Sequence, residues 1–306
     1  MSRTLLAVFA HPDDESFGPG GTLAKYAAEG VAVHLICATL GEAGESDTPE
    51  PDGCGDLACQ REQELRCAAD ILGLTEVHLL GYRDSGMAGS PANLHPRALV
   101  QADPDTLIGQ VADLMRRLRP QVVLTFDPFG GYGHPDHIAM HRATVAAYER
   151  LPDGERPQKL YFTTFPRTTL RWAVRLMPLF GVNPAALGKN QDINLRAVLA
   201  HELPVTTRID ISAYYEVKQR AGACHSSQLS GPGSFWGRLP RWLVRRWRSM
   251  ETFHRATPPF RQGERRERDL FVGVTSDGQH TGWGRGCQHR FAHSYRTASA
   301  GGTWAA

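Results

Sequence analysis

The sequence of 306 residues predicts an α/β protein built on a parallel sheet with helices on both faces. Two observations lead to this prediction. Short, wholly apolar runs, of which Leu5–Ala10 is the first, are typical of strands buried on both faces. Between them lie longer stretches with apolar residues at helical spacing, such as Asp56–Leu72, which ends at the helix-stopping Gly73. Repeated strand–helix–strand units of this kind predict a Rossmann-like sheet of about five or more strands.

The strands of the first half are expected in five segments, with helices between them. The strand segments are Leu5–Ala10, Val31–Leu40, Val77–Tyr82, Val122–Phe126 and Lys159–Phe165. The helical segments are Gly20–Glu29, Asp56–Leu72, Asp105–Leu118 and Asp136–Tyr148. The third of these helices is expected to end before Pro120, because proline lacks the N–H that a helix needs to continue.

Beyond residue 166 the periodicity weakens, and the sequence predicts a C-terminal elaboration of the sheet. Residues 167–205 have a helical or irregular pattern, Tyr214–Cys224 and Arg241–Arg255 have helical spacing, and Leu270–Val274 has the pattern of a short strand. Residues 276–306 are rich in Gly, Ser, Thr, Arg and His, which is typical of a disordered tail. We therefore expect one domain over residues 1–275 and a disordered tail over residues 276–306.

The composition is that of an ordinary globular protein and argues against two classes of partner. Hydrophobic residues make up 41% of the chain and charged residues 22%. The formal net charge of +2 gives no reason to expect nucleic-acid binding. No run of about 20 apolar residues occurs, so we expect no stable membrane insertion.

The six cysteines contain no C-x-x-C pair. Cys37 lies in an apolar strand and Cys67 in a helical pattern, where we expect reduced thiols that pack as small hydrophobic groups. Cys54 and Cys59 share a glycine-rich loop, where pairing or metal binding is the less favoured alternative. The pattern therefore favours a reducing, cytoplasmic setting.

Two motifs that carry chemistry each follow a predicted strand. Ala10–Glu15 reads A-H-P-D-D-E after the first strand, and Gly131–His137 reads G-Y-G-H-P-D-H after the fourth. Each has a proline directly after a histidine, which suits the first turn of a helix. In an open parallel sheet the binding crevice lies beyond the carboxyl ends of the strands, where the strand order reverses. The first and fourth strands are neighbours there in the commonest orders, so the motifs are expected to face each other.

Together the motifs supply the imidazole and carboxylate groups that a catalytic zinc ion uses. Such an ion takes three protein ligands and a water molecule, whose pKa it lowers to about 7. A further carboxylate beside that water can act as general base, so the consecutive Asp13 and Asp14 suit one base and one ligand. His134 and His137 are three residues apart, and either could reach the ion. The candidate residues are His11, Asp13, Asp14, Glu15, His134, Asp136 and His137.

These motifs resemble those of the LmbE-like, or PIG-L, superfamily of zinc-dependent N-acetylglucosamine deacetylases. The resemblance runs from about residue 4 to residue 274 and includes further motifs. They are Gly41-Glu42-Ala43-Gly44, Arg61 with Glu64 ahead of Leu72-Gly73, Arg83-Asp84-Ser85-Gly86-Met87, and Lys218 followed by His225-Ser226-Ser227-Gln228. The resemblance implies a hydrolase that removes the N-acetyl group from an N-acetylglucosamine-type sugar conjugate and releases acetate.

The resemblance also implies which residues bind the metal. It makes His11, Asp14 and His137 the ligands of Zn²⁺, with Fe²⁺ as the alternative ion. It makes Asp13 the general base that takes a proton from the attacking water.

The remaining roles follow from the same resemblance. His134 is placed behind the ligands, oriented by Asp136 and facing the developing oxyanion or the leaving amine. Tyr132 is expected to hydrogen-bond the tetrahedral intermediate. Arg61 and Asp84 are expected to bind the substrate through its sugar hydroxyls.

Several alternatives stay open at this point. The chain could be a deacylase of another N-acyl small molecule, or a metal- or sugar-binding protein without turnover, although the presence of Asp13 and His134 favours turnover. Glu15 is either a partner of the site or a helix-start acid, and His225–Gln228 is either a wall of the site or a surface loop. His34 is expected to pack inside the second strand. The oligomeric state and the group attached to the sugar are not specified.

Overall fold

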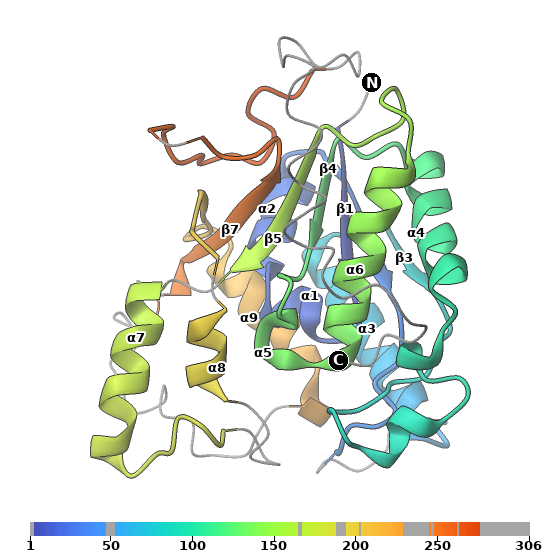
Figure 1. Cartoon of the computed structure of the whole chain (residues 1–306), viewed down its shortest axis with the longest axis vertical. Coiled ribbons are helices and arrows are strands. Elements are labelled where there is room, and N and C mark those ends of the chain that lie inside the picture. The colour runs from blue at the N-terminus through green and yellow to red at the C-terminus, as the bar shows by residue number, and fades with distance from the viewer. Residues whose placement is uncertain are drawn as a thin grey trace.

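The structure is a computed structural model, and it describes residues 3–46, 53–164, 167–187, 194–201, 203–228, 245, 248–261 and 263–275. These residues form a seven-stranded sheet of order β3-β2-β1-β4-β5-β7-β6, with helices on both faces (Figure 1). The first five strands in this order are parallel, whereas β7 is antiparallel to both β5 and β6. The predicted parallel sheet is therefore confirmed, and an antiparallel pair extends one edge. The predicted tail lies outside the described residues.

Every residue of the two central strands β1 and β4 is buried, as expected in the middle of a parallel sheet. These two strands pair directly with each other, as the sequence predicted. The strands are β1 (Thr4–Phe9), β2 (Ala32–Cys37), β3 (Glu76–Leu79), β4 (Val122–Thr125), β5 (Lys159–Thr164), β6 (Thr207–Asp210) and β7 (Met250–Thr257).

The helices of the first half lie where the periodicity predicts them. The helices are α1 (Asp14–Phe17), α2 (Gly20–Ala28), α3 (Leu57–Leu72), α4 (Pro104–Leu118), α5 (Gly130–Gly133), α6 (Pro135–Arg150), α7 (Arg167–Leu176), α8 (Leu195–Ala200) and α9 (Tyr215–Cys224). The cap of α3 is Asp56, whose side chain accepts the backbone N–H of Cys59, and the helix ends at Gly73 in the left-handed region. None of the helices among the described residues is long and apolar enough to span a membrane.

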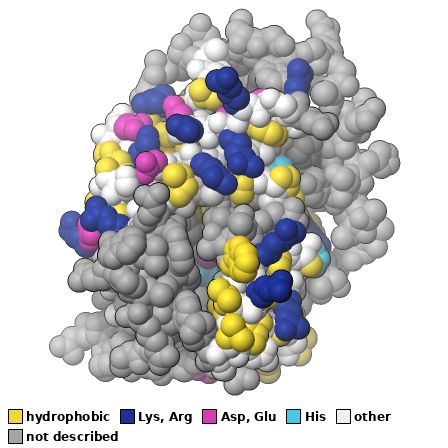
Figure 2. Space-filling view, turned by 90° about the vertical axis from the view of Figure 1, so that its left-hand side faces the viewer, with side chains coloured by type: hydrophobic (Ala, Val, Ile, Leu, Met, Phe, Trp, Pro, Cys, Tyr) yellow, Lys and Arg dark blue, Asp and Glu magenta, His cyan; other side chains and the backbone are white. Residues whose placement is uncertain are grey.

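The elaboration beyond residue 166 is partly helical, as predicted, and begins with α7. Trp172, Leu176 and Leu179 are exposed on this part of the chain. Figure 2 faces this side of the molecule and shows hydrophobic side chains next to Lys and Arg side chains. The elaboration therefore adds an amphipathic surface beside the sheet.

Two predicted elements are wrong. Met250–Arg255 belongs to β7 and not to a helix, while residues 241–244, 246 and 247 of that predicted helix lie outside the described residues. Most residues of β7 are buried on both of its faces, so it lacks the alternation that identifies a half-buried strand. Leu270–Val274 forms turns, although Leu270 and Phe271 are buried in the core, so its apolar run marks packing and not a strand.

The cysteine prediction is also wrong in part. Cys67 of α3 forms a disulfide with Cys224 at the end of α9, and Cys54 pairs with Cys59. Cys37 is the buried free thiol that the sequence predicted. The Cys67–Cys224 pair is 157 residues apart in sequence, so it depends on the docking of α9 against α3 and leaves no local pattern. The cytoplasmic setting stays a prediction.

Candidate active site

The two motifs meet at the carboxyl ends of β1 and β4. His11 follows β1, His137 lies in the first turn of α6, and Nδ1 of His11 is 3.1 Å from Nε2 of His137. The two residues are 126 positions apart in sequence, so the pairing of the two strands brings them together. The predicted convergence of the two motifs is confirmed.

A strained turn shapes the first motif. Asp13 has a φ of 107°, in the left-handed region that non-glycine residues rarely adopt, and it caps α1. Its carbonyl accepts the N–H groups of Ser16 and Phe17, and its own N–H donates to Oε2 of Glu15 at 3.0 Å. The turn places the side chains of Asp13 and Asp14 at the end of β1, next to His11.

Glycines allow the second motif to approach closely. Gly130 has a φ of 68°, and a Cβ there would lie 2.9 Å from Cβ of His137. Pro135 occupies the first turn of α6, where its missing N–H is not needed. His134 caps this helix, because its Nδ1 accepts the backbone N–H of Asp136 at 3.2 Å.

The outer nitrogen of each facing imidazole is held by a partner. Nδ1 of His137 lies 3.1 Å from the carbonyl of Gly130, so the ring donates from Nδ1 and keeps a lone pair on Nε2. Nε2 of His11 lies 3.1 Å from Oδ2 of Asp136 and 3.4 Å from Oδ1 of Asp84, so this ring donates from Nε2 and leaves Nδ1 as the nitrogen that would bind a metal. Partners of this kind are typical of histidines that bind a metal.

Asp14 completes a set of three donors that fits a divalent ion. Its Oδ1 lies 3.4 Å from Nε2 of His137, and its Oδ2 lies 3.7 Å from Nδ1 of His11. The backbone N–H of His11 donates to Oδ2 at 2.8 Å and so orients the carboxylate. Ligand atoms about 2.0–2.2 Å from one zinc ion have mutual distances of this size. A nitrogen of His134 also lies within 4.8 Å of those of His11 and His137.

The electrostatics of the site favour a cation. Burial raises the pKa of Asp13 to about 7, against the opposing effect of the Arg61 charge. Burial also raises the pKa of Asp14 to about 6, against the opposing effect of His11. Burial would lower the pKa of His11, but Asp84 and Asp136 outweigh it and raise this pKa. Oδ1 of Asp136 is buried with no hydrogen-bond partner among the described residues. A bound divalent cation would offset this concentration of buried acidic groups.

Arg61 contacts the predicted base directly. One of its guanidinium nitrogens lies 3.0 Å from Oδ2 of Asp13 and 2.5 Å from the carbonyl of Pro12, and the other donates to the carbonyl of Gly41 at 3.0 Å. A Cβ at Gly41 would overlap the guanidinium, which explains the glycine. Arg61 is 4% exposed, and its ion pair with Asp13 fixes the position of that carboxylate. Its predicted sugar-binding role stays a prediction.

The two remaining acidic residues lie behind His11. Asp84 accepts the N–H of Gly86 and contacts His11, and its predicted sugar-binding role stays a prediction. The Asp136 carboxylate contacts His11 and the N–H of Ser85, so its link to His134 is through its backbone and not through its carboxylate.

Tyr132 lies beside the two histidines of the second motif. Its ring centroid is 5.1 Å from that of His137 and 5.9 Å from that of His134. This position is next to the expected reaction centre, because Nε2 of His137 is one of the proposed metal-binding atoms. The proposed hydrogen bond from Tyr132 to the intermediate stays a prediction.

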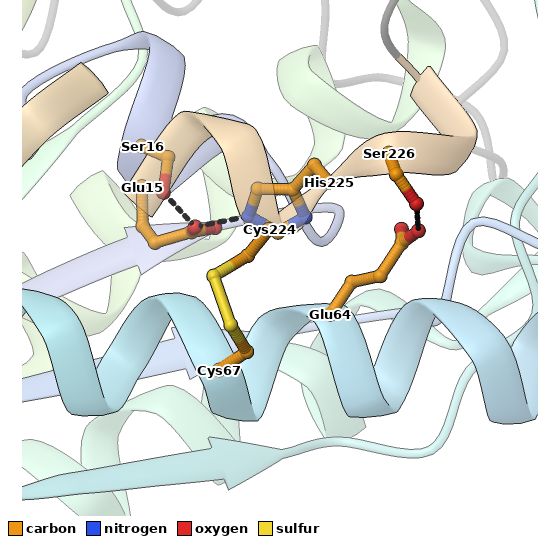
Figure 3. The surroundings of a disulfide bond; sticks show 7 residues. All are labelled: Glu15, Ser16, Glu64, Cys67, Cys224, His225 and Ser226. Carbon is orange, nitrogen blue, oxygen red and sulfur yellow. Dashed lines mark hydrogen bonds and ion pairs between the residues drawn. A yellow bond between two sulfur atoms is a disulfide. The ribbon is translucent and has the colours of Figure 1, made fainter. Parts of the chain in front are cut away.

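A buried pair supports the first motif from behind. Nε2 of His225 lies 2.7 Å from Oε1 of Glu15, as Figure 3 shows beside the Cys67–Cys224 disulfide. Glu64 accepts hydrogen bonds from Ser226 and Ser227 of the same segment. Glu15 is therefore a partner of the site, and His225 is not in a surface loop. No local pattern in the sequence relates Glu15 to a residue 210 positions away, and only the family motif pointed to this segment.

Comparison with known proteins identifies relatives of this chain. The family model described as PIG-L, GlcNAc-PI de-N-acetylase, matches residues 6–148. The 1D-myo-inositol 2-acetamido-2-deoxy-alpha-D-glucopyranoside deacetylase of Acidothermus cellulolyticus is 41% identical over 285 residues, which cover 90% of this chain and 96% of the relative. The enzyme of the same name from Thermobifida fusca is 41% identical over 247 residues, covering 76% and 85%. A solved structure of a conserved protein from Thermus thermophilus matches with a TM-score of 0.50 and 27% identity, covering 84% and 96%.

Proposed function

The chain belongs to the PIG-L family of de-N-acetylases, and we propose that it is a metal-dependent deacetylase of an N-acetylglucosamine-type sugar conjugate. The observation that carries the proposal is the convergence of His11, Asp14 and His137 beside the carboxylate of Asp13. Two relatives of similar length are named as deacetylases of a 2-acetamido-2-deoxy-glucopyranoside of myo-inositol. N-acetylglucosamine linked to inositol is therefore the proposed substrate.

The proposed metal is zinc, held by His11, Asp14 and His137. Bound there, it would polarise the acetamide carbonyl and lower the pKa of a water molecule. Two imidazoles and one carboxylate are a common ligand set of catalytic zinc, and Fe²⁺ is the alternative for the same ligands.

Asp13 is the proposed general base. Its side chain is 20% exposed, so its carboxylate can meet a water molecule, while Arg61 fixes its orientation. It takes the proton of the water as the oxygen attacks the acetamide carbon. The same carboxyl group then returns this proton to the leaving amine, and acetate and the free amino sugar are released.

His134 is the proposed donor to the oxyanion. Burial, together with His11 and His137, lowers its pKa, so its imidazole is neutral at pH 7. Because its Nδ1 accepts the N–H of Asp136, its proton is on Nε2. A neutral imidazole suits a hydrogen bond to the oxyanion, which is worth roughly 3–4 kcal/mol, and Tyr132 is a second candidate donor. Giving the proton to the amine would leave an imidazolate, so the oxyanion role is favoured over the amine role.

Acetate release tests the proposal. Zinc-loaded protein is incubated with N-acetylglucosamine linked to inositol, to malate, to a lipid or to a second sugar, and acetate is measured. We expect release from the inositol conjugate by the native chain, and release roughly 10²–10⁴-fold slower by Asp13→Asn at equal zinc content. Absence of acetate from every conjugate by zinc-loaded protein would overturn the proposed activity, and release from another conjugate would change the substrate.

A further inference from the structure

Two histidines lie side by side on β2 and β3, and neither belongs to the motifs of the active site. His34 pairs with Glu76, and Ile36 pairs with His78, in the parallel ladder between these strands. Residues two apart on a strand share a face, so His34, Glu76 and His78 lie on the same face of the sheet. Nδ1 of His34 is 3.2 Å from Nε2 of His78, and the two rings are stacked at 17°. The backbone ladder holds these side chains close without any ligand.

We propose that His34, His78 and Glu76 form a second site for a divalent transition-metal ion, at the β3 edge of the sheet. One ligand atom from each of the three residues lies within 4.8 Å of the others. Two nitrogens about 2.0–2.1 Å from one tetrahedral zinc ion would be roughly 3.3 Å apart, which matches the imidazole pair. Oε2 of Glu76 lies 3.9 Å from Nδ1 of His34, close enough to supply the third ligand.

Burial and exposure suit both binding and access. His34 and His78 are each 8% exposed, whereas the Glu76 side chain is 58% exposed. An ion bound by the Glu76 carboxylate would therefore lie at the solvent side of the imidazoles, and water molecules could occupy its remaining coordination positions. Burial lowers the pKa of both imidazoles although Glu76 raises them, so both are neutral at pH 7 and keep a lone pair for a metal.

Arg117 is the charged group that opposes the ion. Its guanidinium lies 3.5 Å from Nδ1 of His78 and lowers the pKa of both histidines. Without metal, Arg117 donates to Nδ1 of His78, and the Nε2–H of this ring donates to His34. Metal on Nε2 requires the proton to be on Nδ1, which then faces Oε1 of Glu76 at 3.6 Å. The ion thus replaces the contact with Arg117 by one with Glu76.

The donor set predicts the class of ion. Two imidazoles and one carboxylate favour Zn²⁺, Ni²⁺, Cu²⁺ or Co²⁺ over Mg²⁺ or Ca²⁺, which prefer oxygen ligands. Since the three residues are separate from His11, Asp14 and His137, the two sites bind independently.

Equilibrium dialysis of the full chain against Zn²⁺, with metal content measured, tests the site. The native chain is expected to bind one ion more than the double variant His34→Gln/His78→Gln, which keeps its acetate release. His95→Gln, at an exposed histidine outside the cluster, is the matched control and keeps the native stoichiometry. Equal zinc content in the native chain and the folded double variant would overturn the proposal.

Two single variants keep the test decisive if the double variant does not fold. Glu76→Gln changes an exposed side chain and is expected to weaken binding of the additional ion by about tenfold. Arg117→Gln is expected to tighten it by about tenfold, because a positive charge is removed. Weaker binding in Arg117→Gln, or unchanged binding in Glu76→Gln, would overturn the assigned ligands.

Discussion

Nε2 of His225 lies 2.7 Å from Oε1 of Glu15, and neither side chain is exposed to solvent. Burial alone would raise the pKa of Glu15, but the hydrogen bond and charge of His225 have the larger effect, and the pKa is lowered. Burial alone would lower the pKa of His225, but Glu15 has the larger effect, and this pKa is raised. Each residue of the pair therefore favours the charged form of the other. The other oxygen of Glu15 accepts the N–H of Asp13. The end of α9 is thus linked through one side chain to the proposed base.

Replacing His225 by Gln should lower kcat by about tenfold to a hundredfold, with KM and zinc content nearly unchanged. The change leaves Glu15 buried without its imidazole partner, so the turn that carries Asp13 loses its support. Steady-state kinetics with metal analysis check this. Ser226→Ala is the matched control, because Ser226 is adjacent but contacts Glu64 instead of Glu15. An equal loss of kcat in both variants would contradict a specific role for His225.

Replacing Asp13 by Asn should remove turnover and keep the metal. The amide has the shape of the carboxylate but cannot take a proton, and general-base catalysis contributes roughly 10²–10⁴-fold to a rate. We expect a fall of this size in kcat, with zinc content and thermal unfolding close to native values. Loss of zinc on this substitution would make Asp13 a ligand and reassign the base.

Removing the active-site metal should abolish acetate release reversibly. Nδ1 of His11 lies 3.1 Å from Nε2 of His137, and the two carboxylate oxygens of Asp14 lie 3.4 Å from His137 and 3.7 Å from His11, so removal of one ligand leaves an incomplete site. Chelation should therefore remove activity, and added Zn²⁺ should restore it. His137→Ala should fail to recover under the same zinc concentration. Full activity after verified removal of the metal would exclude metal-dependent hydrolysis.

The sequence predicts the site because its main parts are encoded locally. Apolar runs mark β1 and β4 as buried strands, and a His-Pro pair after each strand marks a helix start. Once these strands are neighbours, His11 and His137 must converge.

Features that depend on docking between distant segments are not predicted in the same way. The contact of Asp84 with His11 depends on how the loop after β3 folds over the sheet. The pairing of Cys67 with Cys224 depends on the packing of α9 on α3. The sequence predicts a helix at Phe253 because most of β7 is buried on both faces, and Met250 and Phe253 have the three-residue spacing of a helix face. Neither periodicity nor spacing records such contacts.

Removing the Cys67–Cys224 disulfide should destabilise the chain more than removing Cys54–Cys59. The two pairs span 157 and 5 residues, and loop-closure entropy assigns them about 5 and about 2 kcal/mol. Denaturant unfolding of Cys67→Ser/Cys224→Ser and of Cys54→Ser/Cys59→Ser under oxidising conditions measures the difference. Equal losses of stability in the two double variants would contradict an effect set by the length of the closed loop.

The free energy of unfolding should fall as the pH drops from 6.5 to about 4, partly because of His141. This residue is buried and donates from Nδ1 to the carbonyl of Phe126 at 2.8 Å. Burial lowers its pKa from 6.5 to about 4. Above pH 6.5 His141 is neutral in both the folded and the unfolded chain, so its titration does not change the free energy of unfolding there. Between 6.5 and 4 only the unfolded chain takes up the proton, so stability is lost there, by up to about 3 kcal/mol.

Urea unfolding at pH 7.5, 6 and 4.5 isolates this contribution when the native chain is compared with His141→Gln. Other groups also titrate in this range, so the measured quantity is the difference in slope between the two chains. The variant is expected to be less stable than the native chain at pH 7.5, because its hydrogen bond to Phe126 and its packing are poorer, and to lose less stability on acidification. His95→Gln, at an exposed histidine, should keep the native slope. Identical slopes for the native chain and His141→Gln would mean that His141 is protonated in the folded state, with the hydrogen bond to Phe126 stabilising its charge.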